Sequence, residues 1–311
     1  EWWPYTLVAI PLTLFGLLVG TGLLLTFYYV PSPEQAYESV ERITNQVYLG
    51  WFVRGLHKCS VDLMILFLLF HVIRVFLTRA YRTPGELKWV SGSLVLFVTF
   101  AMGFTGYSLI YDNVSYWGMT VVTNMIGTLP VVGTPLLYLL RGGEEVSGVT
   151  LLRLYDLHTK LLPVLLGALV IGHVVVVRIM GFAEVEGSRG FHPFYPEHTM
   201  KMGMIAVGLL VLIVDVVMIF PPVLGPPADP QEVASDVSPP WYFSAPFMWI
   251  TLLPGPVALW SLLGGAGLFV AYPFVDRELS RRGWPMAVIN GLVACVVVAG
   301  MAILMYLDTQ M

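Results

Sequence analysis

Two stretches decide the fold: FVRGLHKCSVDLMILFLLFHVIRVFLT at residues 52–78 and YDLHTKLLPVLLGALVIGHVVVVRIM at residues 155–180. Each is long and apolar, and each holds two histidines, His57 and His71 in the first, His158 and His173 in the second. The spacing is fourteen residues in the first stretch and fifteen in the second. On an α-helix these intervals rise about 21 Å and about 22.5 Å and keep both histidines on roughly the same side. Two such helices packed face to face would hold two stacked histidine pairs.

In a soluble protein, a single buried histidine is most often a hydrogen-bonded core residue. Within a membrane a polar side chain is costly and usually functional, and two matching pairs favour bis-histidine ligation of haem. A structural zinc site needs clustered ligands, whereas about 20 Å of helix separates the histidines of each pair. By depth, we expect His57 to pair with His158 and His71 with His173, with one haem b held by each pair.

The composition is that of a membrane protein. Hydrophobic residues make up 57% of the chain and charged residues 12%, whereas a soluble domain carries about 25% charged residues. We therefore expect membrane lipid around the chain. The net charge is −4 and no basic patch stands out, so nucleic acid is not an expected partner. The two cysteines, Cys59 and Cys295, lie in apolar segments and do not form a disulfide framework.

Seven stretches are apolar enough to cross a bilayer, since a spanning helix needs about 20 mostly apolar residues. They predict an all-α integral membrane protein with helices at residues 5–29, 52–78, 90–110, 155–180, 201–223, 246–271 and 285–307. Residues 111–154 are predicted to hold short surface helices, and residues 224–245 form a proline-rich loop. Ten of the sixteen Lys and Arg residues fall at the ends and connections on the N-terminal side. By the positive-inside rule, that side is cytoplasmic.

Several motifs resemble the cytochrome b/b6 family, closest to cytochrome b6 fused to the subunit IV of Rieske/cytochrome b complexes. The resemblance covers nearly the whole chain. Its motifs are Thr26-Phe27-Tyr28-Tyr29, Gly50-Trp51, Phe70-His71-Val72, Thr105-Gly106-Tyr107-Ser108, Leu157-His158-Thr159, Pro227-Ala228-Asp229-Pro230 and Trp241-Tyr242-Phe243. The fifteen-residue spacing in the second stretch is b6-like.

The resemblance implies a b6-like four-helix haem-binding bundle at 1–183 and a subunit IV-like three-helix quinol-site domain at 184–311. It implies the di-haem cytochrome b subunit of a quinol:cytochrome c (or plastocyanin-like acceptor) oxidoreductase in a prokaryotic cytoplasmic membrane. One quinol electron would pass to a Rieske iron–sulfur protein outside. The other would cross both haems to a quinone near the cytoplasm, with proton translocation. A cytochrome c-type subunit and a homodimer are further implied partners.

Glycines and arginines flank the expected haem positions. Gly92 and Gly106 are fourteen residues apart, and with Gly22 they leave room for a flat porphyrin close to a helix backbone. Close helix packing is an equal alternative for each glycine. Residues that lie near haem propionates at either face are Arg54, Arg74 and Arg178. For Lys58 and Arg153 we favour interfacial snorkelling.

The quinol-oxidation motif departs from the family. The family has Pro-Glu-Trp-Tyr, in which the glutamate accepts a quinol proton, and this chain has Pro239, Pro240, Trp241 and Tyr242. Proline has no ionisable group, so another base or a water chain is needed. We expect Asp215, inside a predicted span, or Asp236 to substitute. The alternatives are a helix–helix hydrogen bond for Asp215 and a solvated loop position for Asp236; Tyr111 and Asp112 resemble the wall of the same pocket.

Two further positions carry expectations from the resemblance. Thr6 stands where cytochrome b6 has a cysteine that tethers an extra haem, so no covalent haem is expected there. Near the cytoplasmic quinone site lie Arg178, His192, His198 and Lys201, which relay protons or are merely solvated at the interface.

Two other functions stay open. One is a haem b membrane anchor for a different quinone-linked oxidoreductase, which moves electrons without bifurcation; the missing glutamate favours it. The other is a haem-free seven-helix transporter or receptor, which would show no visible absorption.

Overall fold

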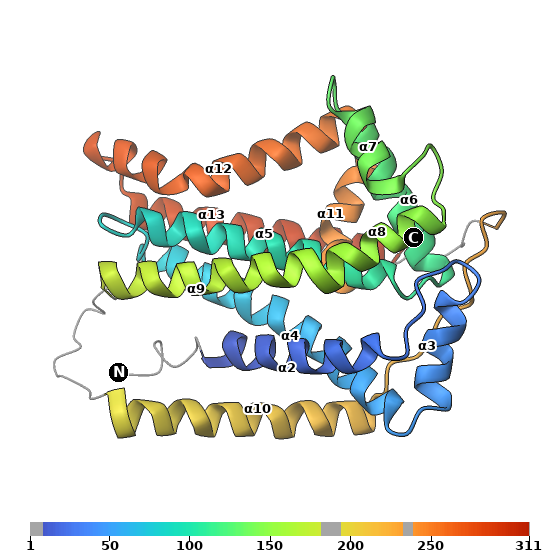
Figure 1. Ribbon diagram of the computed structural model, residues 1–311. Coiled ribbons are helices and arrows are strands. Elements are labelled where there is room, and N and C mark those ends of the chain that lie inside the picture. The colour runs from blue at the N-terminus through green and yellow to red at the C-terminus, as the bar shows by residue number, and fades with distance from the viewer. Residues whose placement is uncertain (1–8, 182–193, 233–238, 311) are drawn as a thin grey trace.

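The computed structural model describes residues 9–181, 194–232 and 239–310 (Figure 1). Within these ranges the chain is helical apart from its connections, and seven helices are long and apolar enough to cross a membrane. The predicted all-α architecture with seven spans is therefore confirmed. The spans are α2 (Ala9–Thr26), α4 (Gly50–Leu77), α5 (Glu86–Ser108), α8–η1–α9 (Gly148–Met180), η2–α10 (Tyr195–Ile219), α12 (Gly255–Arg281) and α13 (Met286–Asp308).

Short helices gather at one end of these spans, on the right in Figure 1. They are α3 (Ala36–Asn45), α6 (Asn113–Gly127), α7 (Gly133–Arg141) and α8 (Gly148–Asp156). Residues 111–154 thus form the predicted surface helices. The sequence did not predict α3, although its buried residues Ala36, Val40 and Ile43 follow the helical spacing of one apolar face.

The prediction of a single span at residues 246–271 is wrong. A short helix, α11 (Trp241–Leu252), ends before the span α12 begins at Gly255. Leu253 is extended, with φ −114° and ψ 151°, because a residue that precedes a proline is driven out of the helical region, and Pro254 follows it. After this break α12 continues to Arg281, well past the expected end, so α11 is a separate helix.

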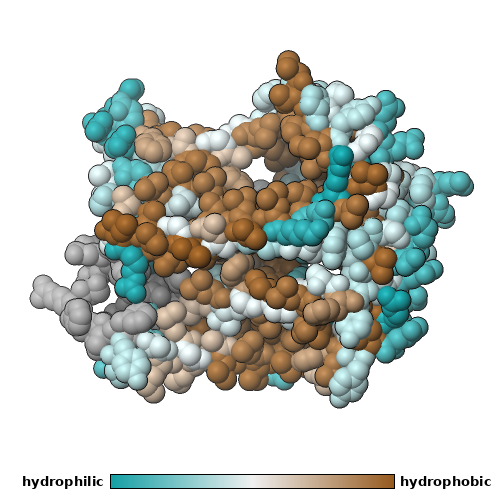
Figure 2. Space-filling view, in the orientation of Figure 1, coloured by the Kyte–Doolittle hydropathy of each residue, from teal (hydrophilic) through white to brown (hydrophobic). Residues whose placement is uncertain are grey.

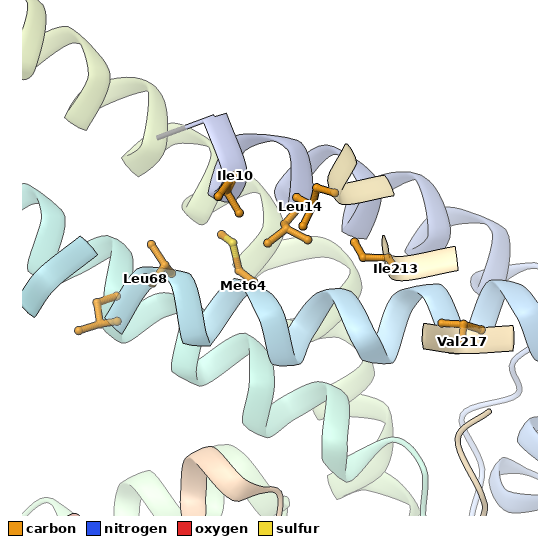
Figure 3. Packing of buried hydrophobic residues seen from close by; sticks show 8 residues of the cluster. Ile10, Leu14, Met64, Leu68, Ile213 and Val217 are labelled. Atoms are coloured by element: carbon orange, nitrogen blue, oxygen red, sulfur yellow. The ribbon is translucent and has the colours of Figure 1, made fainter. Parts of the chain in front are cut away.

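Apolar side chains pack between α2, α4 and α10 in the membrane interior. Figure 3 shows Leu14, Met64 and Ile213 close together, with Val217 further along α4, and all four are at most 3% exposed. Outside this core, apolar side chains cover the surface between the two ends. Figure 2 shows this hydrophobic band, with hydrophilic residues gathered over α3 and α6–α8 at one end and at the helix tips of the other. This is the surface that a hydrocarbon layer requires.

The long helix α8–η1–α9 contains one wide turn. Across η1 (Leu157–Leu161) the backbone forms a π-helical turn, in which the Leu162 N–H donates to the Leu157 carbonyl five residues earlier. Pro163 follows directly and has no N–H for the ordinary bond to Thr159. The turn adds one residue to the helix without breaking it, and it contains His158.

A buried polar network joins the α4–α5 connection to α12 and α13 at the other end. The Asp276 side chain has no exposed surface. Its carboxylate accepts hydrogen bonds from Arg79 Nη2 at 2.6 Å and from the Tyr81 hydroxyl at 2.5 Å. Asn290 of α13 donates to the Tyr81 hydroxyl at 2.6 Å and to the Phe76 carbonyl at 3.2 Å. The network satisfies a buried charge and ties the last two spans to the first half of the chain.

Candidate functional site

The four intramembrane histidines come from two facing spans, α4 and α8–η1–α9. The rings of His57 and His158 lie 6.4 Å apart between centroids, with 73° between their planes. His71 and His173 lie close enough to interact electrostatically. The structure thus brings together the two expected partners at each depth.

Hydroxyl groups on neighbouring spans fix the orientation of three of these rings. Thr21 Oγ1 donates its proton to the Leu17 carbonyl at 2.7 Å and lies 2.9 Å from His57 Nδ1. Because a hydroxyl carries a single proton, the Thr21 oxygen accepts the Nδ1–H of His57. The Nε2 atom of that ring then carries the free lone pair, which is the tautomer that binds a metal.

The same arrangement recurs on α5. Ser91 Oγ lies 2.9 Å from His173 Nδ1 and donates to the Leu87 carbonyl. Thr105 Oγ1 lies 3.1 Å from His158 Nδ1 and donates to the Ala101 carbonyl. Both rings therefore also have a free Nε2. Sequence reasoning missed these hydroxyls, although each directly precedes one of the expected glycines.

Each of those glycines faces a histidine ring. A Cβ atom at Gly22 would lie 3.3 Å from His57 Cε1, one at Gly92 3.1 Å from His173 Cε1, and one at Gly106 2.6 Å from His158 Cε1. The close approach that the sequence predicted is real, but here the imidazole ring itself lies against the glycine. A side chain would push the ring out of line with its hydroxyl partner.

The three expected propionate-binding arginines lie at the ends of the two histidine spans. Arg54 is 9% exposed, and its Nη1 donates to the Pro222 carbonyl at 2.9 Å. Arg54 thus also anchors the segment that follows α10. Arg74 and Arg178 lie in the last turns of α4 and α9.

The Pro-Pro-Trp-Tyr motif begins α11. Pro240 precedes the helix in an extended conformation, and the Tyr242 side chain packs inward with 7% of its surface exposed. A Cβ atom at Gly103 of α5 would lie 3.3 Å from the Tyr242 ring. Burial raises the pKa of the Tyr242 phenol, and the charge of Asp62 raises it further. Trp241 stacks edge-on against Tyr242, so the motif presents an aromatic wall next to α5.

The acidic residues expected near this motif are distributed differently. Asp215 is exposed on α10, which lies along the edge of the bundle opposite α11 (Figure 1), so the structure does not bring it to Tyr242. Asp112 Oδ1 accepts the Ser115 N–H at 2.9 Å and caps α6. Burial raises the pKa of Tyr111 to about 12. Asp236, Thr6 and His192 lie outside the described residues.

Sequence reasoning missed one carboxylate near the motif. Asp62 lies within α4, and its charge acts on Tyr242. The sequence contained a signal for Asp62, because a carboxylate inside a predicted span is costly and is usually functional. The same argument singled out Asp215, which the structure places elsewhere. At the opposite end, His198 and Lys201 begin α10, where both are engaged in interactions.

Comparison with known proteins agrees with this geometry. The family model for cytochrome b/b6/petB matches residues 2–181. The chain belongs to the cytochrome b/b6 family. Cytochrome b6 of Synechococcus elongatus is 42% identical over 179 residues, which are 58% of this chain and 83% of that protein. Cytochrome b6 of a Picosynechococcus species is 40% identical over the same share of this chain. Family membership makes the chain a membrane-bound electron-transport protein and implies haem b.

The fold is also similar to a solved structure described as a hyperthermophilic respiratory Complex III. That chain is 23% identical, with a TM-score of 0.80 over 99% of this chain and 92% of its own length. The likeness extends past residue 181, where the family match ends, and so covers the arrangement of α10–α13.

The histidines and their partners fit haem b. Three histidines have Nδ1 held by a hydroxyl and Nε2 free, and the two facing spans supply one ring each at two depths. Axial ligation of one iron needs two such rings.

Proposed function

We propose that the chain is the di-haem cytochrome b subunit of a quinol-oxidising Rieske/cytochrome b complex in a prokaryotic cytoplasmic membrane. It would pass electrons between an outer quinol-oxidation site and an inner quinone-reduction site, with proton translocation. The observation that carries the proposal is the two histidine pairs at two depths, in which three of the four rings have a free Nε2 atom. The solved relative is described as a respiratory Complex III, which supports a Rieske protein, a cytochrome c-type subunit and quinol as partners.

In this proposal, His57 and His158 hold the outer haem b, and His71 and His173 the inner one. Arg54 serves the outer haem, and Arg74 and Arg178 the inner one. When bound, the haems supply two one-electron centres stacked across the membrane. The chain's own contribution is to orient the ligands through Thr21, Ser91 and Thr105 and to keep close-packed walls at Gly22, Gly92 and Gly106.

The quinol would bind beside Trp241 and Tyr242, where α11 packs against α5. The buried Tyr242 ring shapes this wall. A tyrosine phenol is protonated at neutral pH, and burial raises the pKa of Tyr242 further. A phenol that keeps its proton is a hydrogen-bond donor rather than a base. The proton acceptor must therefore be another group.

We further propose two units, a four-helix haem-binding unit at residues 1–183 and a three-helix quinol-site unit at residues 184–311. The family match ends at residue 181, which supports this boundary. Homodimers are proposed from the family resemblance.

The first experiment is a reduced-minus-oxidised visible spectrum of the purified protein, with haem quantified per chain. The expected result is two b-type haems per chain and no haem left on the denatured polypeptide. A single haem, or none, would contradict the paired-histidine assignment.

Pro240 at the position of the family's glutamate favours a second function, a haem b anchor that transfers electrons without bifurcation. The test isolates the complex under mild conditions and adds an oxidant while quinol is present and the inner site is blocked. Bifurcation predicts that a Rieske protein copurifies and that the oxidant triggers reduction of haem b. An anchor would show neither.

A further inference from the structure

Asp62 is a carboxylate inside a membrane-spanning helix. It lies well within α4, and its Oδ2 pairs with Lys58 Nζ at 2.5 Å, one turn earlier on the same helix. The Asp62 side chain is 25% exposed and that of Lys58 56% exposed. A charged pair at such a position is expensive. Asp276, in contrast, is fully enclosed and tied to several donors, as expected for a structural charge.

Asp62 lies on the face of α4 that meets the quinol motif. Ile65, three residues later, shares this face of the helix. The Ile65 Cδ1 atom and the Tyr242 ring lie 3.5 Å and 3.3 Å from the position that a Gly103 Cβ would take. Ile65 of α4 and Tyr242 of α11 therefore both lie against Gly103 of α5, and Asp62 lies one turn before Ile65 on α4. Its charge acts on Tyr242.

A buried hydroxyl nearby lacks a partner. Tyr107, one turn after Gly103 on α5, interacts electrostatically with Tyr242. Among the described residues its hydroxyl has no hydrogen-bond partner, although it is buried. An unsatisfied buried hydroxyl is costly. The Tyr107 hydroxyl lies 3.1 Å from the position that a Gly118 Cβ would take on α6, so a polar ligand between α5, α6 and α11 would satisfy it. The region thus combines a donor without a partner, an aromatic wall and a carboxylate.

The other acidic candidates are less available. Asp112 also acts electrostatically on Tyr107, but its Oδ1 is used by the cap of α6, and its Oδ2 lies against Gly225. Asp215 is on α10, across the bundle from α11 (Figure 1).

We propose that Asp62 accepts a proton from the quinol that is oxidised beside Tyr242, in place of the glutamate that Pro240 replaces. This inference rests on the proposed function. A quinol that becomes a quinone loses two electrons and two protons. One electron leaves to a Rieske iron–sulfur centre and one to the outer haem. One hydroxyl O–H bond breaks as its proton forms an O–H bond on Asp62, and the second proton leaves by a separate route.

Lys58 completes the arrangement. Its Nζ donates a hydrogen bond to Asp62 Oδ2 at 2.5 Å, which orients the carboxylate. When Asp62 becomes neutral, this pairing is lost. The other titratable groups near Asp62 are Cys59 on the same helix and Tyr242 on α11. Neither is a better base than the carboxylate at neutral pH.

The test uses the intact purified complex and compares Asp62→Asn with Asp62→Glu and with Asp215→Asn. Quinol-dependent reduction of haem b is followed with the inner site blocked. A general base contributes about 100-fold or more, so Asp62→Asn should slow this step about 100-fold. Asp62→Glu should retain most of the rate. Haem content and reduction of the haems by dithionite serve as controls for folding.

A second variant and a second measurement make the assignment specific. Adding Pro240→Glu to Asp62→Asn should restore at least a tenth of the wild-type rate, because it returns a carboxylate to the family's position. Infrared difference spectra on quinol addition should show a protonated carboxyl band that is absent from Asp62→Asn. A wild-type rate in Asp62→Asn, or a loss only in Asp215→Asn, would overturn the Asp62 assignment alone. If the wild-type complex shows no quinol-dependent haem reduction, the proposed function falls as well.

Discussion

The two histidine-bearing spans reach the same geometry from different sequences. On α4 fourteen residues of regular helix separate His57 from His71, whereas fifteen residues separate His158 from His173. The difference is absorbed in the π-helical turn Leu157–Leu161, which takes up one additional residue. Fifteen residues with this turn are therefore equivalent to fourteen without it. Spacing alone is an incomplete description of a ligand pair, because the local winding of the helix decides where the second ring points.

Removing single histidines tests the pairing most directly and should have the largest effect. His57→Leu and His158→Leu should each abolish the same haem, and His71→Leu and His173→Leu the other, because axial ligation needs both rings. Redox titration of the haem b band measures this. If His57→Leu and His158→Leu removed different spectral components, the pairing would be wrong.

Deleting one residue from α8–η1–α9 tests whether the wide turn compensates for the longer histidine spacing. Deletion of Lys160 within the π-helical turn should convert it to a regular turn and retain both haems. Deletion of Leu169 in the regular part of α9 should rotate His173 by about 100° relative to His158 and lose at least one haem. Haem content per purified chain distinguishes the two. Equal loss in both deletions would show that the wide turn does not compensate for the longer spacing.

The glycines should tolerate a methyl group unequally. Gly106→Ala places a Cβ 2.6 Å from His158 Cε1, compared with 3.3 Å from His57 Cε1 for Gly22→Ala. Overpacking of this kind costs about 1–3 kcal/mol, so Gly106→Ala should lower the thermal midpoint of the complex and Gly22→Ala should lower it less. The reverse order in a thermal melt followed by haem absorbance would argue against the ring positions. Gly267→Ala is a control, since nothing lies near that position.

The hydroxyls should give the smallest effect. Thr105→Val removes the acceptor of His158 Nδ1–H, which makes the imidazole less basic and raises the midpoint potential of its haem. A hydrogen bond of about 1 kcal/mol corresponds to about 40 mV. Thr21→Val should shift the same haem, and Ser91→Ala the other one. A spectroelectrochemical titration that showed Thr21→Val and Thr105→Val acting on different haems would contradict the assignment.

The sequence could predict the features that follow from apolar length and regular residue spacing. The spans and the histidine depths follow from apolar length and spacing, which are local properties. The division of residues 246–271 into α11 and α12 depends on Leu253 before Pro254, and a hydropathy pattern does not register such a break. Asp62 lies inside a predicted span, which is itself a sequence signal, but its relation to Tyr242 depends on the packing of α4 and α11 against α5, which are far apart in the chain. The hydroxyls of Thr21 and Thr105 likewise contact histidines on other spans, so their role depends on how the spans pack.

The network around Asp276 holds α12 and α13 to the first half of the chain by hydrogen bonds. Arg79 and Tyr81 hold α12 by its buried carboxylate, and Asn290 holds α13 to the same turn. Those bonds join the two proposed units through space, independently of the covalent link between residues 181 and 194. A chain cut within that link would keep these bonds, so we expect its two parts to stay associated in the bilayer.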